Sequence, residues 1–346
     1  MPQNNTMKKI LVTGGLGFIG SHTVVELVKA GYEPVIIDDL SNSHISILDQ
    51  LTTILGFKPV FHQLDLCDEA AVKNLATSVP DVEGIIHFAA FKAVGESVQY
   101  PLKYYRNNFY SLLNLLNGYY GKPLNFVFSS SCTVYGQPDH LPVTEDAPVK
   151  TAQSPYGNTK QIAEEILKDM IASGSNYKVV SLRYFNPVGA HESALIGELP
   201  IGVPQNLVPF ITQTAIGKRE KVTVFGNDYN TPDGSCVRDY IHVVDLAKAH
   251  VAALKYMEDE SYKGYDVFNI GTGKGTSVLE IVNAFERATG VKFAWTIGPR
   301  REGDVEQVWG DVTKSTEVLK WTAELDVDTM MSSAWEWEKA IANKPL

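Results

Sequence analysis

The chain has 346 residues, of which 44% are hydrophobic and 20% are charged, as in an ordinary globular protein. Its 40 acidic and 30 basic residues give a net charge of −10, which argues against nonspecific nucleic-acid binding, because that binding depends on basic patches. The three cysteines and eight histidines form no CxxC, HxxxH or HExxH pair, so we expect reduced thiols, no disulfide framework and no metal site.

Neither end of the chain nor any internal run suggests a membrane segment. The stretch 1–9 is polar and lacks an apolar core, so we expect no signal peptide. No apolar run approaches the roughly 18 residues that a spanning helix needs. We therefore expect a cytoplasmic protein with no membrane partner.

The first half of the chain alternates short apolar runs with helical patterns. Strands are expected at 9–13, 34–38, 59–64, 84–88, 124–129 and 178–184. Helices are expected at 18–30, 46–55, 69–77, 101–119 and 155–172. This rhythm predicts βαβ units, and the continuously apolar strands indicate helices on both faces of the sheet. The predicted fold class is α/β, a Rossmann-like doubly wound parallel sheet.

The pattern changes after Phe185, where glycine and proline become denser and the apolar runs shorter. We expect a dinucleotide-binding domain over 8–185 and a smaller C-terminal substrate-binding lobe over 186–346. The segment 237–270 could return to the first domain.

Three glycines lie between the first predicted strand and the first predicted helix. Gly14 would permit a tight turn, Gly17 would let the backbone approach a pyrophosphate, and Gly20 would let helix and strand pack closely. The phosphates would then face the unpaired N–H groups of the helix N-terminus. Asp38 ends the second strand, where a carboxylate accepts bonds from a ribose 2′-OH and repels a 2′-phosphate. The pattern therefore favours NAD over NADP.

Other features of this region have competing interpretations. Asp39 can be a solvated loop carboxylate, and Asp65 can either meet the adenine or cap the next helix. The glycine-rich stretch 271–276 resembles a phosphate loop but lacks the required Gly-Lys-Ser/Thr spacing, so we predict an ordinary βα turn.

The reactive group is predicted from three side chains. Tyr156 and Lys160 share one face of a predicted helix, where the ammonium would stabilise a phenolate. Ser131 leaves the carboxyl end of a central strand, the edge at which open α/β sheets bind ligands. Together they predict a proton acceptor beside a hydride acceptor on an alcohol carbon. Taken alone, the tyrosine–lysine spacing is more often a surface pair.

At this point the chain resembles the extended short-chain dehydrogenase/reductase family and, within it, the UDP-glucose 4-epimerases. The motifs that carry the resemblance are TGGLGFIGSH (13–22), HFAAFKAVGES (87–97), SSSCTVYG (129–136), SPYGNTK (154–160), RYFNPVGAH (183–191), RDYIHVVDLA (238–247) and PRREGD (299–304).

The resemblance implies a role for each matching residue. Tyr156 would be the base, Lys160 its electrostatic support and Ser131 the bridge to the sugar 4-OH. NAD would be held by Gly14, Gly17, Phe18, Ile19, Gly20, Asp38, Asp39, Asn42, Ser43, Asp65, Leu66, Phe88, Ala89, Lys92, Asn107, Ser129, Tyr156, Lys160 and Tyr184. The UDP-sugar would be held by Ser131, Tyr156, Phe185, Asn186, Asn206, Leu207, Arg238, Arg301, Asp304 and Val308.

The chain departs from the family pattern at two positions. Asp39 stands where the family often has asparagine, and we expect the second carboxylate to be tolerated near the adenosine ribose. Val308 stands where the family gates the sugar C2 substituent. Because valine is of moderate size, acceptance of UDP-GlcNAc and UDP-GalNAc is open.

The resemblance implies transient oxidation of C4 with NAD bound throughout, rotation of the keto sugar, and hydride return to its opposite face. It also implies a homodimer formed through the helices at 102–119 and 155–172, although two core-covering helices would look similar. Two other functions compete. The first is a sibling 4,6-dehydratase or decarboxylase, of which the dehydratase would need an extra acid–base pair where this chain has Ser131-Cys132-Thr133. The second is a non-catalytic NAD sensor, which would tend to lose Tyr156 and Lys160.

Overall fold

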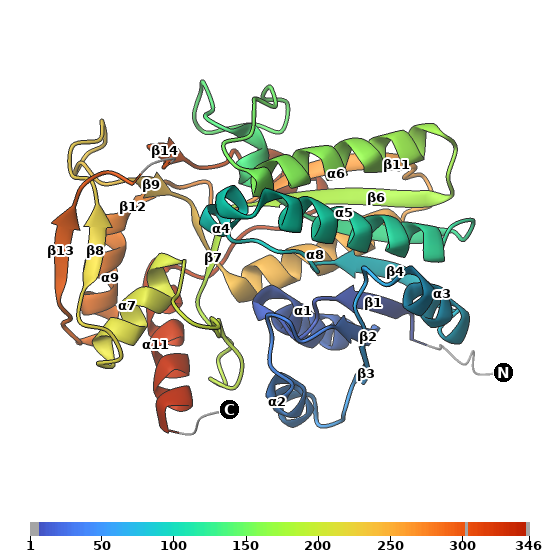
Figure 1. Ribbon diagram of the computed structural model, residues 1–346, viewed down its shortest axis with the longest axis horizontal. Coiled ribbons are helices and arrows are strands. Elements are labelled where there is room, and N and C mark those ends of the chain that lie inside the picture. Colours follow the sequence, from blue (N-terminus) through green and yellow to red (C-terminus); the bar gives the residue numbers. More distant parts are fainter. Residues whose placement is uncertain (1–6, 302–303, 344–346) are drawn as a thin grey trace. The chain divides into compact units, whose positions relative to one another are not determined.

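The computed structural model describes residues 7–301 and 304–343 (Figure 1). Residues 302 and 303, inside the PRREGD motif, lie outside the described part. The chain divides into two compact units. The first comprises the chain up to Ser130 together with 154–182 and 250–267, and the second comprises 131–153, 183–249 and the chain from Phe268 onward. The segment 131–153, which the sequence analysis assigns to the first domain, therefore packs with the second unit.

The first unit is built on a seven-stranded sheet with the order β11-β6-β5-β4-β1-β2-β3, of which Ser131 in β5, 183–184 in β6 and 268–270 in β11 belong to the second unit. Its strands are β1 (Lys9–Thr13), β2 (Glu33–Asp38), β3 (Val60–Gln63), β4 (Val82–His87), β5 (Leu124–Ser131), β6 (Tyr177–Tyr184) and β11 (Gly264–Ile270). Its helices are α1 (Phe18–Lys29), α2 (Ser46–Leu55), α3 (Glu69–Ser78), α4 (Val94–Gln99), α5 (Pro101–Gly118), α6 (Pro155–Ala172) and the end of α8 (Val243–Glu258). Strands β1 to β5 pair in parallel, which confirms the predicted doubly wound α/β class.

Helices cover both faces of this sheet. On one face, Leu75 of α3, Leu115 of α5 and Leu167 of α6 pack in one apolar cluster with strand residues such as Leu11 and Ile85. On the other face, a Cβ added at Gly84 would meet Ile10 of β1 and Leu254 of α8. Burial on both sides explains why the strands are continuously apolar.

The second unit is assembled from short strands and separate helices. Its strands are β7 (Asn186–Val188), β8 (Val222–Phe225), β9 (Val237–Arg238), β10 (Tyr240–His242), β12 (Thr276–Ser277), β13 (Trp295–Gly298) and β14 (Gln307–Val308). Its helices are η1 (Cys132–Tyr135), α7 (Leu207–Ala215), α9 (Val278–Thr289), α10 (Thr313–Val318), α11 (Val327–Asn343) and the start of α8. Its core joins Ile211 of α7, Val224 of β8, Phe285 of α9 and Met331 of α11.

Most strands and helices predicted in the first half of the chain agree with the structure to within two residues. The short helix α4 was not predicted, because its six residues are too few to show a helical period. Across the described ranges, none of the helices combines the length and the apolarity that crossing a bilayer requires.

Candidate active site

The glycine-rich turn joins β1 to α1 in the first unit. Gly14 has φ +68°, and a Cβ on it would lie 3.0 Å from the backbone nitrogen of Ala89. A Cβ on Gly20 would lie 2.2 Å from the carbonyl oxygen of Gly14. Gly17 occupies the N-cap of α1, where no side chain caps the helix. The turn therefore leaves the helix N-terminus uncovered by side chains, so that an anionic group can approach its backbone N–H groups.

Asp38 ends β2 beside this turn and is largely buried. Its carboxylate accepts bonds from the backbone N–H of Leu16 (3.0 Å), the N–H of Leu40 (3.0 Å) and the hydroxyl of Ser43 (2.6 Å). Burial raises the pKa of Asp38, and these three donors oppose that shift. The exposed Asp39 accepts from the N–H and hydroxyl of Ser41, as a local loop carboxylate does.

Asp65 follows β3 and accepts from the N–H of Cys67 at 2.8 Å. The alternative that Asp65 caps the next helix is wrong, because the N-cap of α3 is Asp68, whose side chain accepts from the N–H of Ala71. Asp68 stands directly before the first helical residue, whereas Asp65 lies three residues too early.

The remaining predicted cofactor residues of this unit follow the carboxyl ends of its strands or lie on α1 and α5. They are Phe18 and Ile19 at the start of α1, Asn42 and Ser43 after β2, Leu66 after β3, Phe88, Ala89 and Lys92 after β4, Asn107 on α5, and Ser129 near the end of β5. In a parallel sheet these ends share one edge, which is where open α/β sheets bind ligands.

Tyr156 and Lys160 lie in the first two turns of α6. Ser154 caps this helix by accepting from the N–H of Gly157, and Pro155 suits its first position. The Lys160 ammonium donates to the carbonyl of Ser129 at 2.6 Å and lies 5.9 Å from the centre of the Tyr156 ring. Burial lowers the pKa of Lys160 to about 7, and Glu164 opposes this shift.

His87, which sequence reasoning missed, ends β4 near this lysine. It is buried and hydrogen-bonded to the hydroxyl of Thr13 at 2.8 Å. Burial, and then the charge of Lys160, lowers the pKa of His87 to about 3, so the ring is neutral at physiological pH. The same Thr13 hydroxyl accepts from the N–H of Ala89 at 3.3 Å. The hydrogen bond between His87 and Thr13 thus joins the ends of β4 and β1. In the sequence, only the position of His87 within the motif 87–97 indicates that it could matter.

The second unit contains Ser131 and the predicted substrate residues. The Ser131 hydroxyl accepts from the N–H of Thr133 at 3.2 Å and caps η1. Tyr184, which ends β6, and Phe185 are buried. Asn186 begins β7, which pairs with β10. Asn206 is the N-cap of α7, which starts at Leu207, and its amide donates to Glu198 at 2.6 Å.

The predicted diphosphate ligands are two arginines in this unit. Arg238 of β9 donates to the carbonyl of Val237 at 2.9 Å, and its strand neighbour across the ladder is Val308 of β14. Arg301 forms a forked pair with Asp304, with its nitrogens 2.6 and 3.1 Å from the carboxylate. Arg301 and Asp304 are thus paired with each other, a contact that the sequence analysis did not predict, whereas Arg238 contacts backbone.

The glycine-rich stretch 271–276 joins β11 to the two-residue strand β12, which leads directly into α9, so a short strand interrupts the predicted βα turn. The buried carboxylate of Asp239 accepts from the N–H of Thr272 (2.8 Å), the hydroxyl of Thr272 (2.7 Å) and the N–H of Gly273 (3.0 Å). A protein carboxylate therefore already occupies the donors that a phosphate would use.

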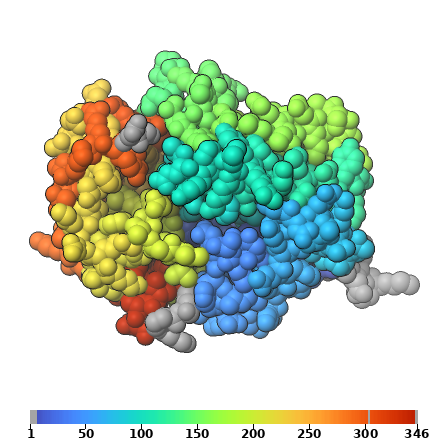
Figure 2. Space-filling model, viewed as in Figure 1, coloured from blue at the N-terminus to red at the C-terminus, as the bar shows by residue number. Residues whose placement is uncertain are grey.

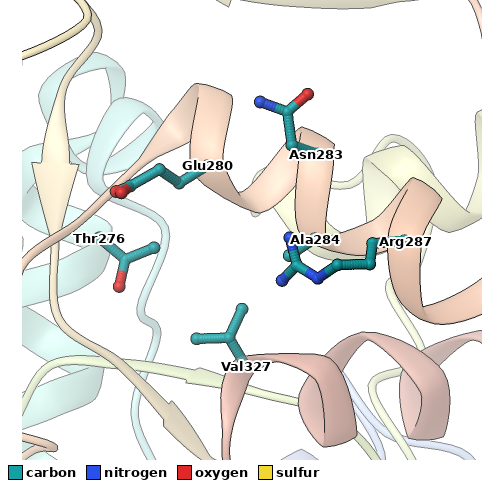
Figure 3. Close-up of a pocket in the computed structure, with 6 residues that line it drawn as sticks. All are labelled: Thr276, Glu280, Asn283, Ala284, Arg287 and Val327. Atoms are coloured by element: carbon teal, nitrogen blue, oxygen red, sulfur yellow. The ribbon is translucent and has the colours of Figure 1, made fainter.

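The second unit has a surface pocket of about 310 Å³, and Figure 3 shows the residues that line it. Its walls are formed by β12, α9 and the start of α11, through Thr276, Glu280, Asn283, Ala284, Arg287 and Val327. None of these residues belongs to the predicted site, and Arg287 is already paired with Asp328. No group of three or more His, Cys, Asp or Glu side chains among residues 7–301 and 304–343 is arranged to hold a metal ion.

Known proteins are similar to this chain in sequence and fold over nearly its whole length. The family model described as GDP-mannose 4,6 dehydratase matches residues 11–334. The UDP-glucose 4-epimerase of Dictyostelium discoideum is 48% identical over 97% of each chain, and that of Yersinia pestis is 47% identical over 95% of this chain and 97% of its own.

Solved structures agree with these relatives. A UDP-glucose-4-epimerase from Stenotrophomonas maltophila, with bound NAD and formylated UDP-arabinopyranose, is 44% identical with a TM-score of 0.93 and covers 98% of this chain and 99% of its own. The enzyme from Bifidobacterium longum in complex with NAD+ and UDP is 43% identical with a TM-score of 0.91, covering 97% and 99%.

Proposed function

This chain belongs to the UDP-glucose 4-epimerase family of extended short-chain dehydrogenases/reductases, and we propose that it interconverts UDP-galactose and UDP-glucose. It is an enzyme of the isomerase class with NAD as its cofactor. The observation that carries the proposal is the buried Lys160 ammonium, fixed to the Ser129 carbonyl one helical turn from Tyr156. This arrangement supplies a proton acceptor stabilised by a desolvated cation.

The first unit fits NAD. Bound NAD supplies an acceptor for the C4 hydride and a donor for its return. The bare turn at Gly14, Gly17 and Gly20 leaves backbone N–H groups at the start of α1 for the pyrophosphate. Asp38 offers a buried carboxylate to ribose hydroxyls, and it would repel the extra phosphate of NADP.

The remaining roles follow from the chemistry of each side chain. Tyr156 takes the proton of the sugar 4-OH and later gives it back, with Ser131 hydrogen-bonded to the same oxygen. Arg238 and Arg301 neutralise the diphosphate, because guanidinium forks suit phosphate oxygens. Tyr184 borders the nicotinamide of the cofactor. The contacts to UDP and sugar are completed by Phe185, Asn186, Asn206, Leu207 and Asp304. The enzyme thereby holds the nucleotide firmly and leaves the sugar free to turn.

Purified protein supplied with UDP-galactose alone tests this proposal. We expect UDP-glucose to form without added NAD and without net NADH, because the hydride taken from C4 returns to the same sugar. Product can be followed by nuclear magnetic resonance of the anomeric proton. Accumulation of a stable keto sugar would instead identify a dehydratase. A protein that does not convert UDP-galactose would be a non-catalytic NAD sensor.

We also propose activity toward UDP-GlcNAc and UDP-GalNAc. Val308 is buried in an apolar cluster with Val134, Tyr135, Val143 and Phe185, so this side chain of moderate size is held in place by its neighbours. A UDP-Glc/GlcNAc 4-epimerase of Campylobacter jejuni is 36% identical with a TM-score of 0.81.

Replacing Val308 with tyrosine should separate the two activities. We expect the variant to lose at least about 10-fold in kcat/KM for UDP-GalNAc relative to UDP-galactose, because the larger side chain fills the space of the C2 substituent. Val318→Tyr, an exposed valine on α10, is the control. Equal loss with both substrates, or wild-type protein inactive on UDP-GalNAc, would contradict the assignment.

A homodimer and a cytoplasmic location complete the proposal. Exposed apolar side chains lie along α4 and α5, including Val98, Leu102, Tyr110 and Leu113, and a second copy of the chain would cover them. Light scattering should then give twice the mass of one chain, and a monomer would contradict the dimer. The three cysteines are free thiols, which suits a reducing compartment.

A further inference from the structure

The end of β5 is bound to α6 by two neighbouring residues. The carbonyl of Ser129 accepts from the Lys160 ammonium at 2.6 Å, and the hydroxyl of Ser130 donates to the Glu164 carboxylate at 2.6 Å. Lys160 and Glu164 lie one turn apart on the same helix, and their side chains are 4% and 2% exposed. The buried Lys160 ammonium and the buried Glu164 carboxylate are thus both hydrogen-bonded to the end of β5.

We propose that Glu164 is a positioning residue of the reaction, whose carboxylate, held by Ser130, keeps the Lys160 ammonium charged and fixed beside Tyr156. This inference rests on the proposed function of Tyr156 and Lys160. Glu164 itself contacts neither substrate nor cofactor in this account. It acts through the lysine alone.

The charges around Lys160 support this role. Two titratable groups face it from its own helix, Tyr156 and Glu164, and His87 faces it from β4. Tyr104 of α5 faces Tyr156 in turn. His87 is neutral because its pKa is about 3, and a histidine has no negative form that could balance the buried ammonium. The Glu164 carboxylate is the group that opposes the effect of burial on the pKa of Lys160.

Removing the Glu164 carboxylate is expected to lower the pKa of Lys160. Burial lowers the pKa of Lys160 to about 7 with the carboxylate present. Without the carboxylate the pKa falls further, and the lysine loses its proton at a lower pH. A neutral lysine cannot stabilise the Tyr156 phenolate, so the alkaline limb of the rate profile must move toward acid.

The test is the pH profile of kcat for Glu164→Gln, measured on purified holoenzyme with UDP-galactose. We expect the alkaline limb to move about one pH unit toward acid, with about 10-fold less activity at the wild-type optimum. Glu165→Gln is the matched control, because it makes the same change at the next, exposed position of α6. We expect its profile to match the wild type.

Glu164→Asp keeps the negative charge on a side chain that is one methylene shorter. We expect the alkaline limb of its pH profile to move toward acid by less than in Glu164→Gln. If Glu164→Gln does not fold, the pH profile of Glu164→Asp tests whether the carboxylate sets the alkaline limb. A profile that keeps its wild-type limb while only thermal stability falls would show a purely structural role and overturn the inference. An inactive wild type would instead refute the proposed function, so the two failures are distinguishable.

Discussion

Replacing Tyr156 with phenylalanine is expected to lower kcat by about 10³-fold while the protein keeps its NAD. The change removes only the phenolic oxygen, which in this account is the group that takes the proton from the sugar 4-OH. The lysine, its bond to the Ser129 carbonyl and the glycine turn all remain. Turnover of UDP-galactose and the cofactor content of the purified variant measure the two effects separately.

A second tyrosine provides the control for this change. Tyr120 follows α5 with 62% of its surface exposed, and Tyr120→Phe removes the same hydroxyl away from the proposed site. We expect that variant to have wild-type kcat. Near-normal activity in Tyr156→Phe would refute the assignment of the base, whereas loss of NAD from it would indicate a damaged cofactor site.

Replacing Gly20 with alanine should strongly destabilise the first unit and weaken its hold on the cofactor. The added Cβ would lie 2.2 Å from the Gly14 carbonyl oxygen and 2.8 Å from the Gly15 Cα, and both are backbone atoms that cannot rotate away. We expect a loss of at least about 3 kcal/mol in the free energy of unfolding, at the upper end of overpacking effects. Denaturant unfolding and NAD content of the purified variant measure it.

Gly95→Ala is the matched control, because a Cβ at that position in α4 meets nothing within 4 Å. Alanine also has the higher helix propensity, so this variant should be at least as stable as the wild type. If Gly20→Ala unfolded at the same denaturant concentration as Gly95→Ala, the close approach of α1 to the turn would not matter for stability.

The sequence predicts the first unit well because its signals are local. Each strand is a continuous apolar run, each long helix has its own period, and the positive φ of Gly14 is a property that glycine alone adopts readily. Asp38 was found for the same reason, since it ends a recognisable strand.

The interactions that the sequence did not predict depend on tertiary burial. His87 looks like an ordinary polar residue in the sequence, and only the packing of β4 and α6 makes it a neighbour of Lys160. Glu164 lies one helical turn from Lys160, but only the packing of α6 on β5 buries it and brings it to the Ser130 hydroxyl. The role of Asp239 is similar, because its three donors lie more than 30 residues away in the chain. No local pattern reports such contacts.

The second unit was predicted only in outline. Several of its strands have two or three residues, which is too short for any period to appear. Their pairing joins distant segments, as when Val308 of β14 lies opposite Arg238 of β9. The motifs supplied the proposed substrate residues here, whereas the strand pairing came from the structure.

The most direct test of the central claim uses UDP-galactose that carries deuterium at C4 of the sugar. If C4 is oxidised and then reduced within one enzyme molecule, the UDP-glucose formed in ordinary water must retain the deuterium at C4. Mass spectrometry and nuclear magnetic resonance of the product read this directly. We expect full retention with inverted configuration, and loss of the label to solvent would contradict the mechanism.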